Sequence, residues 1–323
     1  MRRVATRLAA LLLALPLIPP AWAQPYPSKP VRIVVAFSPG TGIDILAREA
    51  GQELSRRLQQ PFVVENRPGA SGNLGMGLVA KADPDGYTIS VMVNTFAVNA
   101  ALFTNLPFDS IKDFAPVGMM ARGGLALVVN GNVKATTTRE LIDEAKRNPG
   151  KLNYASPGVG TPQHVAMELF KLSAGVDIVH VPHKSSAEAV TGLLGGQTEA
   201  MFLPVHTTLP HIKSGRLRVL SVASKARNPL LPETPTIAES AGIPGFEVDL
   251  WYAMLVPART PSEVIDKLNA ELRVILAMDS MRVKLASQGL QLETGTPAQL
   301  AEILRTDIDK WSKVIKSAGI KPE

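Results

Sequence analysis

Apolar runs alternate with amphipathic segments along this chain, and the alternation predicts an α/β protein. Residues 31–37 form an apolar run rich in β-branched side chains, which is typical of a buried parallel strand. After it, Ile43, Leu46 and Leu54 recur at helical spacing. Comparable strands are predicted at 62–65, 87–93, 126–130, 152–155, 177–181 and 200–203, and helices at 73–81, 137–148, 161–172 and 186–194. This order predicts a sheet flanked by helices on both faces.

The pattern starts again near Leu125, and a segment rich in proline and glycine, residues 229–245, precedes the tail. The tail contains one strand and two helices, at 250–256, 260–277 and 297–318. Thr260 and Glu263 are expected to cap the first of these helices. We therefore expect two lobes with a ligand cleft between them, the tail packing on the first lobe. The predicted domains are 24–123 together with 249–323, and 124–248.

The N-terminus has the three parts of a secretory signal peptide. Three arginines precede an apolar run at 8–18, and Ala21-Trp22-Ala23 supplies a cleavage site before Gln24. The alternative is a retained membrane anchor, but the run has 11 residues (18 − 8 + 1), fewer than the roughly 20 that a spanning helix needs. The sequence predicts an exported protein whose residues 1–23 are removed.

Charge and composition exclude several classes of protein. The full chain carries 34 − 28 = +6, and without the three arginines of the signal segment 31 − 28 = +3 remains, so no basic surface for nucleic acid is expected. The absence of cysteine excludes disulfides, thiolate nucleophiles and thiolate metal sites. A hydrophobic fraction of 46% indicates a folded globular chain.

One pentapeptide pattern, S-P-G-x-G, occurs at 38–42 and again at 156–160, which is 156 − 38 = 118 residues later. Both copies lie between a predicted strand and a predicted helix. Glycines let the backbone turn and approach a ligand there, and the first N–H groups of a helix are free to bind an anion. The two copies therefore predict a site for a small carboxylate between the lobes; the alternative is that both are only tight turns.

Several side chains near these junctions can complete such a site. The hydroxyl and amide groups are those of Ser38, Thr41, Ser71, Asn94, Thr95, Ser156 and Thr161. Asp44 either contacts the ligand or caps its helix, and His164 either donates a hydrogen bond to the ligand or packs at the helix start. The five histidines lack metal-binding spacing, and neither a nucleophile elbow nor a phosphate loop occurs, so we expect no metal, no cofactor and no catalysis.

Seven motifs in order resemble the Bug family, the extracytoplasmic solute receptors of tripartite tricarboxylate transporters. They lie at 26–35, 37–44, 64–70, 82–88, 154–161, 209–217 and 231–236. The resemblance implies a two-lobed fold of the periplasmic binding protein type (type II) that closes on a small carboxylate: a di- or tricarboxylate, an acidic amino acid or an aromatic acid. It also implies a grip by two loops, Ser38, Gly40, Thr41 and Asp44 in the first and Ser156, Gly158, Thr161 and His164 in the second.

The chain departs from the family pattern at three places. Thr41 replaces the second glycine of P-G-G, His183 stands where many relatives have tyrosine, and Leu203 stands where many have aspartate, with His206 close by. We expect Leu203 and His206 at the far end of the pocket, favouring a ligand whose far end is anionic or aromatic.

The resemblance implies a monomeric periplasmic receptor that delivers its ligand to membrane permease subunits. Two alternatives remain: a receptor that feeds a sensor kinase, and a periplasmic enzyme with His164 as base and Asp44 as orienting carboxylate.

Overall fold

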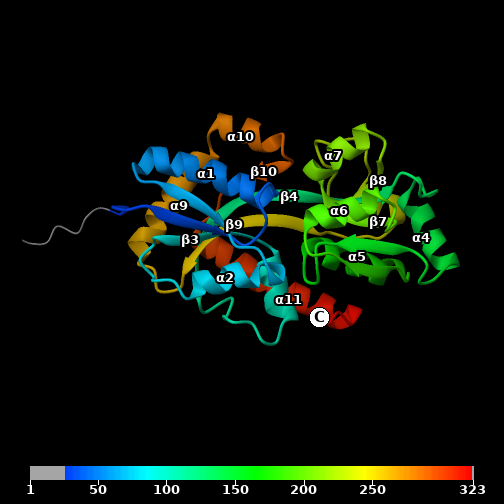
Figure 1. Ribbon diagram of the computed structural model, residues 1–323, viewed down its shortest axis with the longest axis horizontal. Helices are drawn as coiled ribbons and strands as arrows, with labels where there is room; N and C mark the ends of the chain where they lie inside the picture. The colour runs from blue at the N-terminus through cyan, green and yellow to red at the C-terminus, as the bar shows by residue number, and fades with distance from the viewer. Residues whose placement is uncertain (1–25, 322–323) are drawn as a thin grey trace, which may run out of the picture.

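The computed structural model describes residues 26–321. Its ten strands form one curled sheet in the order β2-β1-β3-β9-β4-β7-β5-β6, with β8 and β10 also paired to β4. Figure 1 shows helices on both faces of this sheet and two halves joined by β4 and β9. The mixed α/β class predicted from the sequence is confirmed.

We call the first half lobe 1. Its strands are β1 (Val31–Val35), β2 (Phe62–Asn66), β3 (Thr88–Val93), β9 (Asp249–Pro257), β10 (Leu290–Leu292) and the start of β4 (Phe114–Asn130). Its helices are α1 (Gly42–Leu58), α2 (Asn73–Ala80), α3 (Thr95–Leu102), α9 (Ser262–Leu276), α10 (Asp279–Ala286) and α11 (Pro297–Ala318), with a short 3-10 turn η1 (Ala70–Gly72). β1 pairs in parallel with both β2 and β3, so the carboxyl ends of all three strands share one edge.

We call the second half lobe 2. Its strands are the end of β4, β5 (Asn153–Ser156), β6 (Val179–Pro182), β7 (Ala200–Pro204) and β8 (Leu217–Val222). Its helices are α4 (Thr138–Arg147), α5 (Pro162–Ala174), α6 (Ser186–Leu194), α7 (Val205–Lys213) and α8 (Ile237–Ala241). β5 pairs in parallel with β6 and β7, which repeats the arrangement of lobe 1.

The long strand β4 joins the lobes by changing partners. It pairs with β9 as far as Gly124 and with β7 from Leu125 onward. A Cβ on Gly123 would lie 3.3 Å from the ring of Tyr252, and one on Gly124 would lie 3.0 Å from Nδ2 of Asn228. The glycines therefore let two neighbours approach closely where the partner changes.

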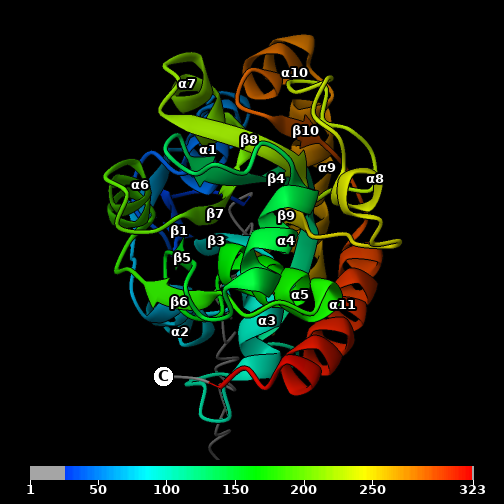
Figure 2. The ribbon, with the colours of Figure 1, turned by 90° about the vertical axis from the view of Figure 1, so that its right-hand side faces the viewer.

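The tail helices α9 and α11 lie against lobe 1. α9 packs against α1 and β4, while α11 packs against α3 and β4 and also touches α5 of lobe 2. Trp311 of α11 is fully buried in the apolar core. Figure 2, which looks along the long axis, shows α11 running beside α3 and α5.

Three details differ from the sequence prediction. The strand predicted to begin near 126 begins at Phe114, because β4 serves both lobes. Thr260 is not a helix cap: its hydroxyl donates to the carbonyl of Pro257, and α9 begins after Pro261 without a side-chain cap. The proline- and glycine-rich segment contains α8, whose Thr236 and Glu239 form a reciprocal capping box.

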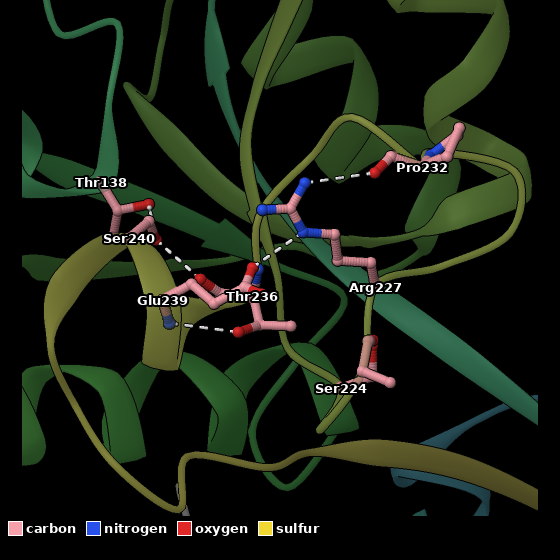
Figure 3. A network of polar contacts seen from close by, with 8 residues as sticks. Thr138, Ser224, Arg227, Pro232, Thr236, Glu239 and Ser240 are labelled. Atoms are coloured by element: carbon pink, nitrogen blue, oxygen red, sulfur yellow. Dashed lines mark hydrogen bonds and ion pairs between the residues drawn. The ribbon is translucent and has the colours of Figure 1, made fainter.

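Figure 3 shows how this segment is fixed to lobe 2. Arg227 donates to the carboxylate of Glu239 at 3.0 Å, and Ser240 donates to the hydroxyl of Thr138 on α4 at 3.1 Å. The segment is thus held in place by polar contacts instead of serving as a loose linker.

No helix within residues 26–321 combines the length and apolarity needed to cross a bilayer. The predicted signal peptide, residues 1–23, lies outside the described residues.

Candidate functional site

The first candidate loop joins β1 to α1 (residues 36–41; the α1 loop). Gly40 adopts a φ of +79°, in the left-handed region that favours glycine, and Thr41 is the N-cap residue at φ −76° and ψ 159°. The Gly40 N–H donates to the Asp44 carboxylate at 2.9 Å, and the Thr41 hydroxyl donates to the Ser38 carbonyl at 2.9 Å. These two bonds fold the loop back onto the first turn of α1.

The carboxylate of Asp44 is fully used inside the protein. Besides Gly40, it accepts from the amide of Asn66 at 2.9 Å and from Nε of Arg48 at 3.0 Å. Burial alone would raise the pKa of Asp44, but the hydrogen bonds from Arg48, Gly40 and Asn66 together lower it. Asp44 is therefore ionised, paired and turned toward the protein.

The second candidate loop joins β5 to α5 (residues 157–161; the α5 loop). Gly160 has a φ of +78°, and the N-cap residue Thr161 lies at φ −70° and ψ 153°. The Gly160 N–H donates to Nδ1 of His164 at 3.4 Å, and the Thr161 hydroxyl donates to the Gly158 carbonyl at 2.7 Å. Because Nδ1 accepts, the ring proton of His164 is on Nε2.

The two loops have the same conformation at their last two residues, in a register that differs from the sequence repeat. Thr41 matches Thr161 and Gly40 matches Gly160, an offset of 161 − 41 = 120 residues, whereas the S-P-G-x-G repeat has an offset of 118. The structural counterpart of Asp44 is therefore His164.

Three neighbouring aromatic rings, those of Tyr154, His164 and His180, pack beside the α5 loop. The rings of His164 and His180 lie 4.4 Å apart, and Tyr154 stacks on His180 at 4.7 Å. Nε2 of His180 lies 2.6 Å from the hydroxyl of Ser156, which itself accepts from the Gly158 N–H at 3.1 Å. Burial lowers the pKa of His164 to about 4 and that of His180 to about 3, so both rings are neutral at pH 7.

The helices that begin at these loops have no side-chain cap. The N-cap threonines of α1 and α5 direct their hydroxyls to the loop carbonyls instead of the helix N–H groups. Four other helices are capped by a hydroxyl that accepts from the third helical N–H: Thr137, Ser185, Thr236 and Thr296. The uncapped first turns of α1 and α5 therefore keep N–H groups available for an anion.

The η1 turn of lobe 1 brings the two loops together. Ser71, at φ +53°, donates across the lobes to the carbonyl of Val159 at 2.6 Å, and a Cβ on the adjacent Gly72 would lie 3.3 Å from the ring of Phe37. Asn99 of α3 donates to the Ser71 carbonyl at 2.9 Å, and a Cβ on Gly160 would lie 2.8 Å from Oδ1 of Asn99. Lobe 1 thus meets the α5 loop through Ser71 and Asn99.

The remaining predicted residues divide into two groups. Asn94 and Thr95 are buried beside the sheet edge; the Asn94 amide donates to the Asp249 carbonyl at 3.0 Å, while its oxygen and the Thr95 hydroxyl are without a partner among the described residues. His206, at the start of α7, lies against Gly42 of α1. Leu203 lies away from these residues: its side chain is fully buried in the apolar cluster of lobe 2.

Two supporting residues were not predicted. Asn66 is the last residue of β2, the parallel strand next to β1, and the rule that strand carboxyl ends share an edge could have found it. Tyr252 belongs to the antiparallel strand β9, whose position depends on a contact with β4 more than 100 residues away in sequence, and no local pattern indicates it.

Cavities of about 200 and 520 Å³ share no residue with either loop. The smaller one is lined by residues of both lobes, among them Arg122, Lys225 and Asp249. Burial, followed by the nearby charge of Glu247, raises the pKa of Asp249 to about 6.

Comparison with known proteins gives a consistent result. The model of the tripartite tricarboxylate transporter family receptor (TctC) matches residues 46–320. BugT of Bordetella pertussis is 34% identical over 304 residues, which cover 94% of this chain and 93% of BugT.

Two solved structures from Rhodopseudomonas palustris are similar to most of this chain. Rpa4515 with adipate has a TM-score of 0.87 at 35% identity and covers 92% of this chain and 100% of that one. MatC with bound malate has a TM-score of 0.83 at 29% identity and covers 90% of this chain and 100% of that one.

Proposed function

The chain belongs to the tripartite tricarboxylate transporter family of receptors, and we propose that it captures a small carboxylate between its two lobes. One observation carries the proposal: α1 and α5 begin at matching loops of opposite lobes, and neither helix has a side-chain cap. The partial positive charge and free N–H groups of a helix start stabilise a carboxylate without a cationic side chain. Ser38, Gly40, Thr41, Ser71, Gly158 and Thr161 form the proposed grip.

The charges around the loops favour an acid that lacks an ammonium group. Asp44 is neutralised by Arg48, and Glu168 accepts from Tyr154 at 2.6 Å and from Lys171 at 2.8 Å. Neither carboxylate is free to pair with an ammonium group, whose desolvation would then be uncompensated. The adipate and malate held by the two relatives are likewise acids without an amino group. His164 and Asp44 serve here as loop anchors, which gives the enzymatic alternative no support.

The proposal also covers where the protein acts, to which partner it delivers its ligand and how its lobes move. Residues 1–23 would export the chain to the periplasm, where it would deliver its ligand as a monomer to the permease subunits. The lobes would act as domains 24–123 with 249–323 and 124–248, since β4 changes partners at Gly123 and Gly124. Opening would separate Ser71 from Val159 and expose both loops.

A thermal-shift screen of mono-, di- and tricarboxylates at neutral pH tests this function. We expect at least one acid to raise the melting temperature in proportion to the logarithm of its concentration, because only the folded state binds it. If no acid raises the melting temperature, or if an acid is consumed while a product accumulates, the receptor function is wrong.

The substitution Gly158→Asp tests the grip itself. Gly158 has a φ of +122°, so any side chain strains the backbone, and Gly158→Asn carries the same strain without the charge. Isothermal titration should find at least a tenfold greater loss of affinity for the aspartate variant than for the asparagine variant. Equal losses would mean that the α5 loop does not face the anion.

A further inference from the structure

The η1 turn contains two consecutive residues in an unfavourable backbone conformation. Ala70 has a φ of +47° and Ser71 a φ of +53°, and within residues 26–321 the other non-glycine residue with a positive φ is Gln59. The left-handed region is disfavoured for such residues because the Cβ lies too close to the following carbonyl oxygen. A strained conformation persists only where surrounding contacts impose it, and such strain is concentrated at switches and binding sites.

Neither core packing nor local chemistry accounts for the conformation of these two residues. Ala70 is exposed, so its methyl group buries little apolar surface. Asparagine and aspartate can stabilise the left-handed region through a local hydrogen bond of the side chain, but alanine cannot. The Ser71 hydroxyl is not used locally either, because it donates to the carbonyl of Val159 in the α5 loop.

The turn is held from both lobes. Within lobe 1, the Asn99 amide donates to the Ser71 carbonyl at 2.9 Å, and the Gly72 N–H donates to the Gly69 carbonyl at 3.0 Å. From lobe 2, the carbonyl of Val159 accepts from the Ser71 hydroxyl at 2.6 Å. Of these three bonds, the last depends on the placement of the lobes, so their separation would remove one of the contacts that hold the turn.

We propose that the η1 turn is a strained latch of the closed form. Closure on the ligand brings Ser71 against Val159 and keeps Ala70 and Ser71 left-handed, and opening lets the turn relax. Strain that is present only in the closed form lowers the population of that form, and it therefore weakens the affinity and speeds release of the ligand. The inference rests on the proposed function, because it concerns closure on a bound acid.

Substitutions of Ala70 test the latch, because this exposed side chain can be changed without removing any of the three hydrogen bonds. The probe is the acid that binds the unsubstituted chain most tightly among acetate, benzoate, malate, adipate and citrate. Ala70→Gly should lower the dissociation constant about fivefold, the factor that corresponds to a left-handed penalty of about 1 kcal/mol. Ala70→Asn should lower it less, and Ala70→Val should raise it at least threefold, because a β-branched residue tolerates a positive φ worst.

Isothermal titration measures these affinities, and stopped-flow mixing should show slower release of the acid from Ala70→Gly. Gln59→Gly is the matched control, because Gln59 is exposed and has a φ of +54° at the opposite end of α1 from the α1 loop. It relieves similar strain away from the contact between the lobes, and we expect the dissociation constant to change less than twofold.

Two failures can be told apart. If Ala70→Gly and Ala70→Asn leave the dissociation constant within twofold of the unsubstituted chain, or raise it, the turn is equally strained in the open and closed forms and the latch is wrong. That result would leave the receptor function standing. Failure of all five acids to bind the unsubstituted chain would instead overturn the proposed function.

Discussion

The α1 loop and the α5 loop enter their helices with the same backbone conformation but are held by two different anchors. Both pair a glycine near φ +78° with an N-cap threonine, and both tie the glycine N–H to a side chain four residues later. In the α1 loop the anchor is the ionised Asp44, paired with Arg48; in the α5 loop it is the neutral His164, stacked on His180. The anchor only needs to accept a hydrogen bond, and in both loops the anchor group adds no net charge beside the proposed anion.

Replacing each anchor with alanine should destabilise the protein by different amounts. Asp44→Ala leaves Gly40, Asn66 and Arg48 without their acceptor. We expect the free energy of unfolding to fall by about 3 kcal/mol, a figure that allows for the exposure of Arg48. His164→Ala removes one long hydrogen bond and some ring packing, and we expect a loss of about 1.5 kcal/mol. Urea unfolding measures both.

Asp44→Asn is the control, since it keeps the size of the side chain and one acceptor oxygen. We expect it to recover part of the 3 kcal/mol lost in Asp44→Ala, on the scale of one charged hydrogen bond of about 1.5 kcal/mol. If His164→Ala proves more damaging than Asp44→Ala, the charged anchor is not the stronger one.

The second prediction separates two glycines that share a conformation. A Cβ on Gly40 meets nothing within 4 Å, so Gly40→Ala should cost only the strain of its φ, about 1 kcal/mol. A Cβ on Gly160 would lie 2.8 Å from Asn99 and 3.0 Å from Leu102, so Gly160→Ala should cost about 2.5 kcal/mol. Equal losses in urea unfolding would mean that the α5 loop does not press on lobe 1.

The sequence predicted the local parts of these loops because local rules govern them. Strand ends, helix starts and glycine turns depend on neighbouring residues, and the elements around residues 38–44 and 156–164 were correctly placed. The repeat nevertheless matched Ser38 with Ser156, whereas the structure matches Ser38 with Gly158. A spacing in sequence does not report which residue caps a helix.

What escaped prediction depends on distant contacts. The family resemblance predicts a pocket position for Leu203, but its side chain is fully buried in the apolar cluster of lobe 2. β4 extends over both lobes because β9, β10, β7 and β8 all pair with it. Such pairings join segments separated by about 100 residues and leave no periodic signal.

Acid pH should change the free energy of unfolding through three histidines and Asp249. His164, His180 and His206 have pKa values of about 4, 3 and 4, below the ordinary 6.5, so the unfolded chain takes up protons that the folded chain excludes. The free energy of unfolding should therefore fall as the pH drops from 6.5 toward 4. Asp249 opposes this, since its pKa of about 6 means that the folded state holds a proton which the unfolded carboxyl loses above 3.8.

The smallest expected effect is that of pH on the affinity for the ligand. Between pH 8 and 5.5 Asp44 stays ionised and His164 stays neutral, because both lose their native charge state only below that range. The dissociation constant for the carboxylate with the largest thermal shift should change less than twofold over this range, in titrations where the chain remains folded. A histidine that bound the anion as a cation would instead strengthen binding about tenfold per pH unit above its pKa as the pH falls, since the protonated fraction grows by that factor. A steep rise toward pH 5.5 would therefore replace the neutral anchor of the α5 loop with a charged one.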